Sequence, residues 1–220
     1  MHMDRRQFVK NLGLGTASLS MGSLVTASSC APSGDSSLKQ NVKEGEDGQF
    51  LFIGDDIAIA QTEYGKVQGY LLNHVYTFLG VPYGADTSGK NRFMPPQKPE
   101  PWTDVRPAVF YGNTAPQRME NRWPNNYGTF ADHWNYWDVS EDCLYLNVWT
   151  PGIADGKKRP VLVWLHGGGF TNGSGIEQDG YHGENISREG DIVFCSINHR
   201  LGPIGFSDLS GVGGEAYKDS

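Results

Sequence analysis

The chain has 220 residues, which is enough for one well-buried domain without requiring two. Its 38% hydrophobic and 20% charged residues are ordinary for a globular protein, although 29 glycines is a high number. A net charge of −7, with no basic cluster beyond residues 157–159, argues against a nucleic-acid partner, because phosphate binding needs a basic face.

Residues 1–29 indicate an export signal that is not part of the fold. Arg5 and Arg6, followed by the apolar Phe8, form the twin-arginine pattern of a Tat signal. Residues 11–27 are mildly apolar and rich in small residues, too short and too polar for a stable membrane span. The alternative is an ordinary secretory signal with two chance arginines. Either interpretation predicts a periplasmic or extracellular protein.

A small-residue stretch ends this signal at a cysteine. Ala27, Ser28 and Ser29 precede Cys30, which resembles the bacterial lipobox whose cysteine receives the lipid. Residues 30–49 are rich in serine, glycine and charged residues and predict a flexible linker. Simple cleavage near Ser29 is the alternative, so membrane contact is expected only through a lipid anchor on Cys30.

The folded body is expected to begin near Phe50. Residues 57–61, 66–72 and 75–79 are rich in β-formers and are separated by turn signals, which predicts three short strands. Four prolines fall between residues 90 and 106 and exclude a regular helix or a central strand there.

Aromatic residues crowd residues 115–139, a stretch with little helical or strand periodicity. Aromatic density in a loop is typical of a lid over apolar space, and such lids line pockets for acyl or alcohol groups. The alternative is that the rings seal the domain's own core. The rings belong to Trp123, Tyr127, Phe130, Trp134, Tyr136 and Trp137.

A short apolar strand then runs into three consecutive glycines. Residues 161–165 carry no polar alternation, which predicts a strand buried on both faces. Gly167, Gly168 and Gly169 follow His166 and let backbone N–H groups face outward, where they suit an oxygen that bears negative charge. A tight strand-to-loop turn is the alternative for the glycines alone.

Five stretches, in order along the chain, carry a family resemblance: residues 78–83, 92–96, 141–151, 166–169 and 191–206. The third reads EDCLYLNVWTP and the fourth reads HGGG, the lipase and esterase form of the oxyanion loop. Together they resemble the type-B carboxylesterase and cholinesterase family of α/β-hydrolases, from about Ile57 to the last residue. The resemblance implies an α/β fold in which a small antiparallel sheet precedes the first strands of a large mixed sheet. Residues 50–220 would then form the N-terminal portion of that domain.

The resemblance also implies a serine esterase that acts on a small-molecule ester through an acyl-enzyme, with no cofactor and no metal. The N–H groups of Gly168 and Gly169 would bind the oxyanion, and Gly167 would shape the turn. The family carries its nucleophile in a G-x-S-x-G elbow, followed by the acid and the histidine. The sequence reaches Ser220 without that elbow, so we expect the N-terminal part of an esterase, without its catalytic serine, acid and histidine.

Two other functional interpretations remain open. The parent protein could be a non-catalytic, neuroligin-like binding or adhesion member of the family, which the residue at the elbow would decide. The chain could also be an inactive truncated product, in which the strand at residues 161–166 would leave an apolar edge uncovered. The oligomeric state is left open by the sequence.

Three motifs imitate sites without their context. Ser207 follows Gly205, but Leu209 stands where the elbow needs its second glycine. Residues 211–216 fit G-x-G-x-x-A but have no strand directly before them, as a dinucleotide site requires. None of the six histidines has a metal-binding spacing such as H-E-x-x-H, and His166 precedes the expected serine, so it is not the family's base.

The resemblance assigns structural roles to several further residues. Arg92 is expected to form a buried ion pair with Glu141. The family closes the aromatic loop with a disulfide that ends at Cys143, but the upstream position carries Ala115, so Cys143 is expected to be a buried free thiol.

Three other residues complete these expectations. Cys195 lies among apolar strand residues and is expected to be a small core hydrophobe. Arg200 is expected to form an ion pair with an acid further along the chain. Trp134 lies one residue away from a cation-binding tryptophan of the cholinesterases, so it receives no role.

Overall fold

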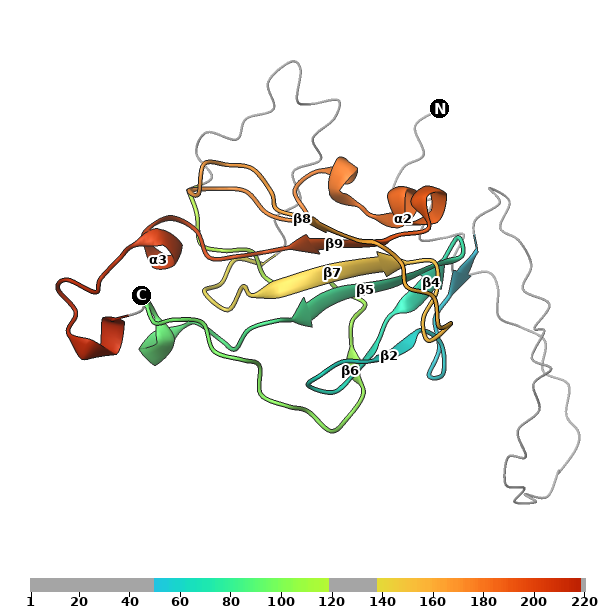
Figure 1. Cartoon of the computed structure of the whole chain (residues 1–220), viewed down its shortest axis with the longest axis horizontal. Coiled ribbons are helices and arrows are strands. Elements are labelled where there is room, and N and C mark those ends of the chain that lie inside the picture. The colour runs from blue at the N-terminus through green and yellow to red at the C-terminus, as the bar shows by residue number, and fades with distance from the viewer. Residues whose placement is uncertain (1–49, 119–137, 219–220) are drawn as a thin grey trace, which may run out of the picture. The chain divides into compact units, whose positions relative to one another are not determined.

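The computed structural model describes residues 50–118 and 138–218, all within the compact unit Val42–Ser220 (Figure 1). A six-stranded sheet forms its centre, in the order β1 (Leu51–Phe52), β4 (Tyr70–Leu72), β5 (Val75–Pro82), β7 (Tyr145–Thr150), β9 (Val193–Ile197) and β8 (Val161–Trp164). All neighbours are antiparallel except β8 and β9, which are parallel. The expected large mixed sheet is therefore present.

A second, three-stranded sheet consists of β2 (Ile59–Gln61), β3 (Lys66–Gln68) and β6 (Arg106–Pro107). β2 and β3 are antiparallel, whereas β6 runs parallel to β3, so the small sheet is mixed and not wholly antiparallel as expected. The single strand predicted for residues 66–72 is also wrong, because it divides at Gly69. The Gly69 N–H donates to Ala58 O, and a Cβ at this glycine would collide with the Thr77 carbonyl oxygen.

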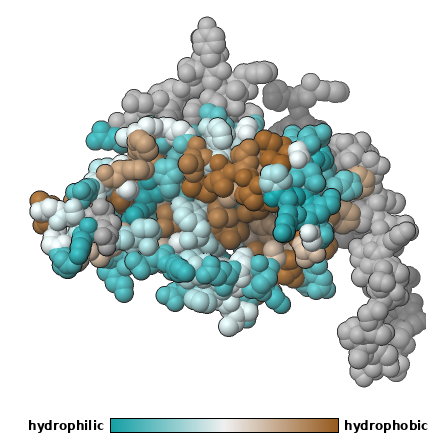
Figure 2. All heavy atoms as spheres, viewed as in Figure 1, coloured by the Kyte–Doolittle hydropathy of each residue, from teal (hydrophilic) through white to brown (hydrophobic). Residues whose placement is uncertain are grey.

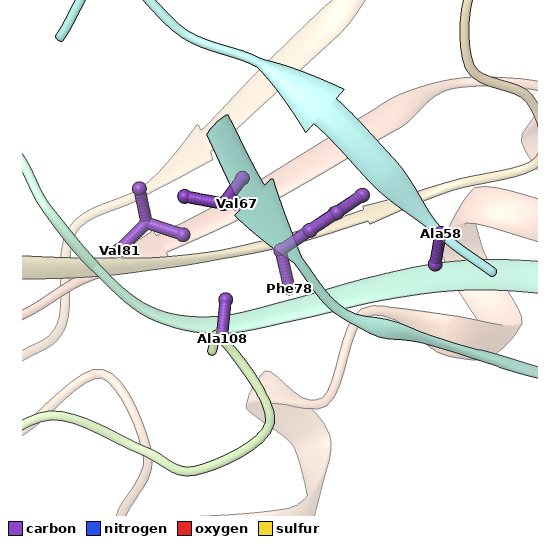
Figure 3. Close-up of a cluster of buried hydrophobic side chains, with 5 residues drawn as sticks. All are labelled: Ala58, Val67, Phe78, Val81 and Ala108. Carbon is purple, nitrogen blue, oxygen red and sulfur yellow. The ribbon is translucent and has the colours of Figure 1, made fainter. Parts of the chain in front are cut away.

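Alternating residues of β5 and β7 supply two separate cores. On one face Phe78 and Val81 pack with Ala58, Val67 and Ala108, which joins the two sheets (Figure 3). The opposite face carries a second cluster, made by Val75, Leu79, Trp149 and Phe194. The two-residue repeat of a strand separates Phe78 from Val75 and Leu79, and a register shift between Phe78 and Val81 returns Val81 to the face of Phe78.

A helix that the sequence did not predict covers the second face. α2 (Glu184–Gly190) packs against β5, β7 and β9 (Figure 1). The Ser187 hydroxyl is fully buried and donates to the Trp149 carbonyl at 3.0 Å. The other helices within residues 50–118 and 138–218 are short: η1 (Gly89–Asn91), η2 (Asp179–Tyr181), α3 (Gly202–Phe206) and η3 (Glu215–Tyr217).

The strand before the glycines lies at an edge of the large sheet. β8 pairs only with β9 among the described strands, and all four of its residues are exposed, with Val161 at 63% and Val163 at 53%. The prediction of a strand buried on both faces is therefore wrong for this structure, whereas the expected apolar edge is present. Figure 2, in the same view as Figure 1, shows apolar residues gathered over the middle of the large sheet.

The ion pair expected from the resemblance forms, but it is not buried. Arg92 Nε lies 2.8 Å from Glu141 Oε2, with the two side chains 49% and 17% exposed. The guanidinium hydrogen bonds to this carboxylate, which raises the pKa of Arg92. The pair therefore ties residue 92 to the start of β7 from the surface of the domain.

The cysteine predictions are confirmed for the two thiols that the structure describes. Cys143 and Cys195 are both buried and both free. Burial raises their pKa values to about 12 and about 11, respectively. Arg200 donates to the Met94 carbonyl at 2.8 Å, so its expected acidic partner further along the chain stays a prediction.

Several predictions fall outside the described residues: the export signal, Cys30 and its linker, and the aromatic rings between residues 119 and 137. Among the residues that are described, no helix has the length and apolar character needed to cross a membrane.

Candidate active site

The glycine loop is an exposed turn directly after β8. Gly167, Gly168 and Gly169 are all exposed, with φ at +117° for Gly168 and +62° for Gly169. Phe170 continues the turn at φ +64°, a conformation that residues other than glycine rarely adopt. The chain thus reverses direction within four residues, and the Gly202 N–H anchors the end of the turn by donating to Phe170 O at 2.7 Å.

Gly168 is the glycine of this turn at which there is no room for a side chain. Its carbonyl accepts hydrogen bonds from Thr171 N, Thr171 Oγ1 and Asn172 N at 3.2, 3.0 and 3.3 Å. A Cβ at Gly168 would collide with the Asn172 carbonyl oxygen, whereas one at Gly167 or Gly169 would meet nothing within 4 Å. The loop is closed around Gly168 and open on either side of it.

The amides of this turn are left available. Within residues 50–118 and 138–218, no acceptor is hydrogen-bonded to the N–H of Gly167, Gly168 or Gly169. Successive exposed N–H groups in a turn with positive φ form a concave surface of partial positive charge, which favours anionic oxygen. The turn can therefore bind such an oxygen without first breaking a hydrogen bond within the described structure.

The His166 side chain contacts the backbone at the start of the turn. Its ring is almost fully buried, and its Nδ1 lies 2.8 Å from Gly167 O. The ring stacks on His199, with 4.5 Å between centroids and 5° between planes, and His199 Nδ1 in turn lies 2.8 Å from Arg200 O. Each ring is thus fixed by the backbone carbonyl that follows it, which holds the start of the glycine loop against the end of β9.

An open pocket of about 580 Å³ borders the loop, and its lining is mostly apolar. Gly167 and Gly169 form one wall, and Phe170, Leu201 and Phe206 contribute apolar surface. The rings of Phe170 and Phe206 lie 4.7 Å apart. An apolar space beside available amides can hold the hydrocarbon part of a substrate whose carbonyl oxygen meets the loop.

Two side-chain amides that sequence reasoning missed connect the loop to the rest of the domain. Asn198 Oδ1 accepts from Gly175 N at 2.8 Å, and its Nδ2 donates to Asn113 O at 3.0 Å. Gln117 makes a similar pair of bonds to Gly173. The sequence signal was faint: a polar residue follows the apolar stretch that ends at Ile197, and an isolated glutamine lies at the start of the aromatic stretch.

Tyr83 also contributes to this region from β5's end. Its hydroxyl donates to the Asn198 carbonyl at 2.8 Å, and burial raises the pKa of Tyr83 well above its ordinary value. The hydroxyl therefore stays protonated as a fixed donor in the pocket wall.

The motifs rejected from the sequence have no site context in the structure either. Ser207 follows the short helix α3 and is not on a turn between a strand and a helix. No strand precedes residues 211–216 among the described residues after β9. No group of three or more potential metal ligands is found in the described part of the chain.

Comparison with known proteins decides the family. The model of the carboxylesterase family matches residues 56–214. The chain belongs to the carboxylesterase family. It is 45% identical over 157 residues to phenmedipham hydrolase of Pseudarthrobacter oxydans, covering 71% of this chain and 30% of that protein. It is 39% identical over 165 residues to para-nitrobenzyl esterase of Bacillus subtilis, covering 74% and 31%.

The solved structures agree with this assignment. An esterase from Clostridium hathewayi, described as able to hydrolyse aliphatic aromatic polyesters, matches with a TM-score of 0.67 and 39% identity, covering 77% of this carboxylesterase chain and 32% of that one. The α/β-hydrolase fold expected from the sequence is thereby confirmed. The chain spans only about 30% of the length of the curated relatives that it matches.

Proposed function

We propose that the full-length carboxylesterase to which this chain belongs hydrolyses small carboxylic esters through an acyl-serine intermediate. A serine encoded beyond Ser220 attacks the ester carbonyl carbon and gives its proton to a histidine base, while the carbonyl π electrons move to the oxygen. The alcohol then leaves with that proton, and water releases the acid from the acyl-serine.

In this proposal the glycine loop stabilises the negative oxygen of the tetrahedral intermediate. The N–H groups of Gly168 and Gly169 bind it, joined by one from the residue after the serine, and Gly167 forms the approach to the turn. One observation carries the proposal: Gly168 and Gly169 are exposed residues, Gly169 lines an apolar pocket, and neither N–H meets an acceptor among the described residues. Donors fixed before the reaction stabilise developing charge without reorganisation.

The names of the relatives support carboxylic esters as the substrate class. Para-nitrobenzyl esterase and the Clostridium hathewayi esterase are both described as esterases. The apolar pocket beside the loop is consistent with an uncharged acyl or alcohol group. We therefore expect p-nitrophenyl esters of short acids to be turned over.

The test is hydrolysis of p-nitrophenyl butyrate by the purified full-length protein, together with labelling by a fluorophosphonate. We expect turnover, and covalent labelling of one serine within a G-x-S-x-G sequence beyond Ser220. A folded protein that neither hydrolyses the ester nor reacts with the label contradicts the proposal and favours the non-catalytic binding member of the family.

We also propose that the protein is exported and held at a bacterial membrane by lipid on Cys30. The twin-arginine pattern at Arg5 and Arg6 and the small residues before Cys30 support this. Mass spectrometry of the mature N-terminus should find diacylglycerol on Cys30. A mature N-terminus with a free thiol at that cysteine contradicts the lipid anchor, and retention of residues 1–29 contradicts export.

A further inference from the structure

The side chain of Gln117 forms hydrogen bonds with both backbone polar groups of Gly173, which lies 56 residues further along the chain. Gly173 N donates to Gln117 Oε1 at 2.8 Å, and Gln117 Nε2 donates back to Gly173 O at 2.9 Å. The same Nε2 also donates to Ala115 O at 3.1 Å. Both backbone polar groups of Gly173, which is buried, are therefore satisfied by one side chain.

Gly173 in turn lies directly against the beginning of the glycine loop. A Cβ at Gly173 would collide with Gly167 O and would lie 2.5 Å from His166 Nδ1. Its φ of +113° also disfavours any side chain. The backbone of Gly173 therefore forms a close-packed support beneath the Gly167 carbonyl, on which His166 Nδ1 also converges at 2.8 Å.

The Gly167 carbonyl and the Gly168 N–H belong to one planar peptide group. In a trans peptide the C=O and N–H bonds point in opposite directions, so fixing the carbonyl fixes the direction of the amide. There are no cis peptide bonds in the described chain. With Gly167 O held against Gly173 and His166, the Gly168 N–H is directed away from them.

We infer that Gln117 is a positioning residue for the glycine loop. Its carboxamide holds Gly173 beneath the Gly167–Gly168 peptide, and that support fixes the Gly168 N–H in the direction needed to meet a substrate oxyanion. The inference rests on the proposed esterase function for its chemical consequence, but the mechanical link from Gln117 to the loop is independent of it.

A second side chain, Asn198, joins the same two segments, so the role of Gln117 can be tested without unfolding the domain. Asn198 joins Gly175 to Asn113, so the segments around residues 113–117 and 173–175 stay connected when Gln117 is changed. Gln117→Leu removes both bonds to Gly173. Gln117→Glu keeps an acceptor for the Gly173 N–H but places a carboxylate against its carbonyl, so this variant is expected to be defective as well.

Gln61→Leu is a matched control, because Gln61 is exposed in β2 and, among the described residues, its side chain bonds only to the adjacent Thr62 carbonyl. The full-length protein and its variants are first titrated with a fluorophosphonate to count active sites. We then measure kcat and KM for p-nitrophenyl butyrate and the inhibition constant of a trifluoromethyl ketone, whose oxyanion adduct needs the same amides. Amide hydrogen exchange is followed over residues 166–173.

For Gln117→Leu we expect kcat per titrated site to fall roughly tenfold or more, less than the ~10²–10³ typical when an oxyanion donor is lost altogether. KM should stay within about twofold, and the inhibition constant should rise by the same factor as kcat falls, because the loop acts on the transition state. Exchange over residues 166–173 should be faster than in wild type and in Gln61→Leu.

Unchanged kcat, a defect confined to KM, or an equal defect in Gln61→Leu overturns the inference. A wild-type protein without esterase activity defeats the proposed function instead. In that case the exchange measurement alone decides the role of Gln117: faster exchange over residues 166–173 in Gln117→Leu supports it, and unchanged exchange overturns it.

Discussion

Ala115 and Cys143 lie in the same buried cluster, together with Leu144 and Leu201. The chain segments that carry them run side by side, since Thr114 N donates to Asp138 O and Ser140 N donates to Thr114 O. The family resemblance implies a disulfide at this place in relatives, but Ala115 replaces its upstream cysteine, and the structure has the expected free thiol at Cys143 in the same cluster as the Ala115 methyl group. The two ends of the aromatic loop are therefore brought together by packing and backbone hydrogen bonds.

We predict that Ala115→Cys forms a disulfide with Cys143. A cross-link that closes a loop of this length typically contributes about 2–4 kcal/mol, mainly by restricting the unfolded chain. Under denaturing conditions, thiol titration of the oxidised variant should find one free thiol fewer than in wild type, and the midpoint of urea unfolding should rise. Ala115→Cys combined with Cys143→Ala is the control, because it cannot form this bond. One additional free thiol in the single variant contradicts the prediction.

The buried thiols predict a loss of stability at high pH. Burial raises the pKa of Cys143 from an ordinary 9.0 to about 12, so the unfolded chain loses this proton at lower pH than the folded one. Stability is thus unaffected below about pH 9 and falls between pH 9 and 12, at up to ~1.4 kcal/mol per pH unit for one such group. Cys143→Ala should reduce the slope of the unfolding free energy against pH above 9. An unchanged slope contradicts the assignment to this thiol.

The sequence predicted the segments that carry family motifs better than the segments around them. β7 and β9 lie within the stretches 141–151 and 191–206, which carry the family resemblance. α2 was missed because its seven residues show no apolar helical repeat and only Ser187 is fully covered. Its position is set by packing on the sheet, a tertiary effect that local patterns do not contain.

The site was predictable only where it is local in sequence. The turn at residues 167–169 follows from three consecutive glycines, two of which, Gly168 and Gly169, have positive φ angles. The contact between Gln117 and Gly173 joins residues 56 apart, and no periodicity predicts such a pair. The burial of β8 was misjudged for a related reason: the exposure of an apolar strand depends on which strands lie beside it.

The ion pair between Arg92 and Glu141 should depend strongly on salt. It joins segments 49 residues apart, but the Arg92 side chain is about half exposed, so water and ions screen the interaction. We expect a double-mutant cycle of Arg92→Gln and Glu141→Gln to give a small coupling at low ionic strength that largely disappears at about 1 M salt, where the Debye length is about 3 Å. A coupling that persists undiminished at high salt shows that the pair behaves as a buried one.

A single added methyl group should have a large effect at Gly168 and a small one at Gly167. At Gly168 a Cβ would collide with Asn172 O and φ is +117°, so Gly168→Ala must displace the peptide that carries the N–H. Proline is excluded there for the same reason, since its φ is fixed near about −65°. At Gly167 a Cβ meets nothing within 4 Å and φ is not positive, so Gly167→Ala should change the free energy of unfolding by less than about 0.5 kcal/mol.

If the full-length protein has the proposed esterase activity, Gly168→Ala should lower kcat by roughly 10²–10³, the effect of losing one oxyanion donor, with fluorophosphonate labelling retained. Urea unfolding of Gly167→Ala serves as the stability reference, because it adds the same methyl group one residue earlier in the same loop. Wild-type kcat in a folded Gly168→Ala protein would show that this amide does not meet the reacting oxygen, since the turn cannot accept the methyl group without moving that N–H.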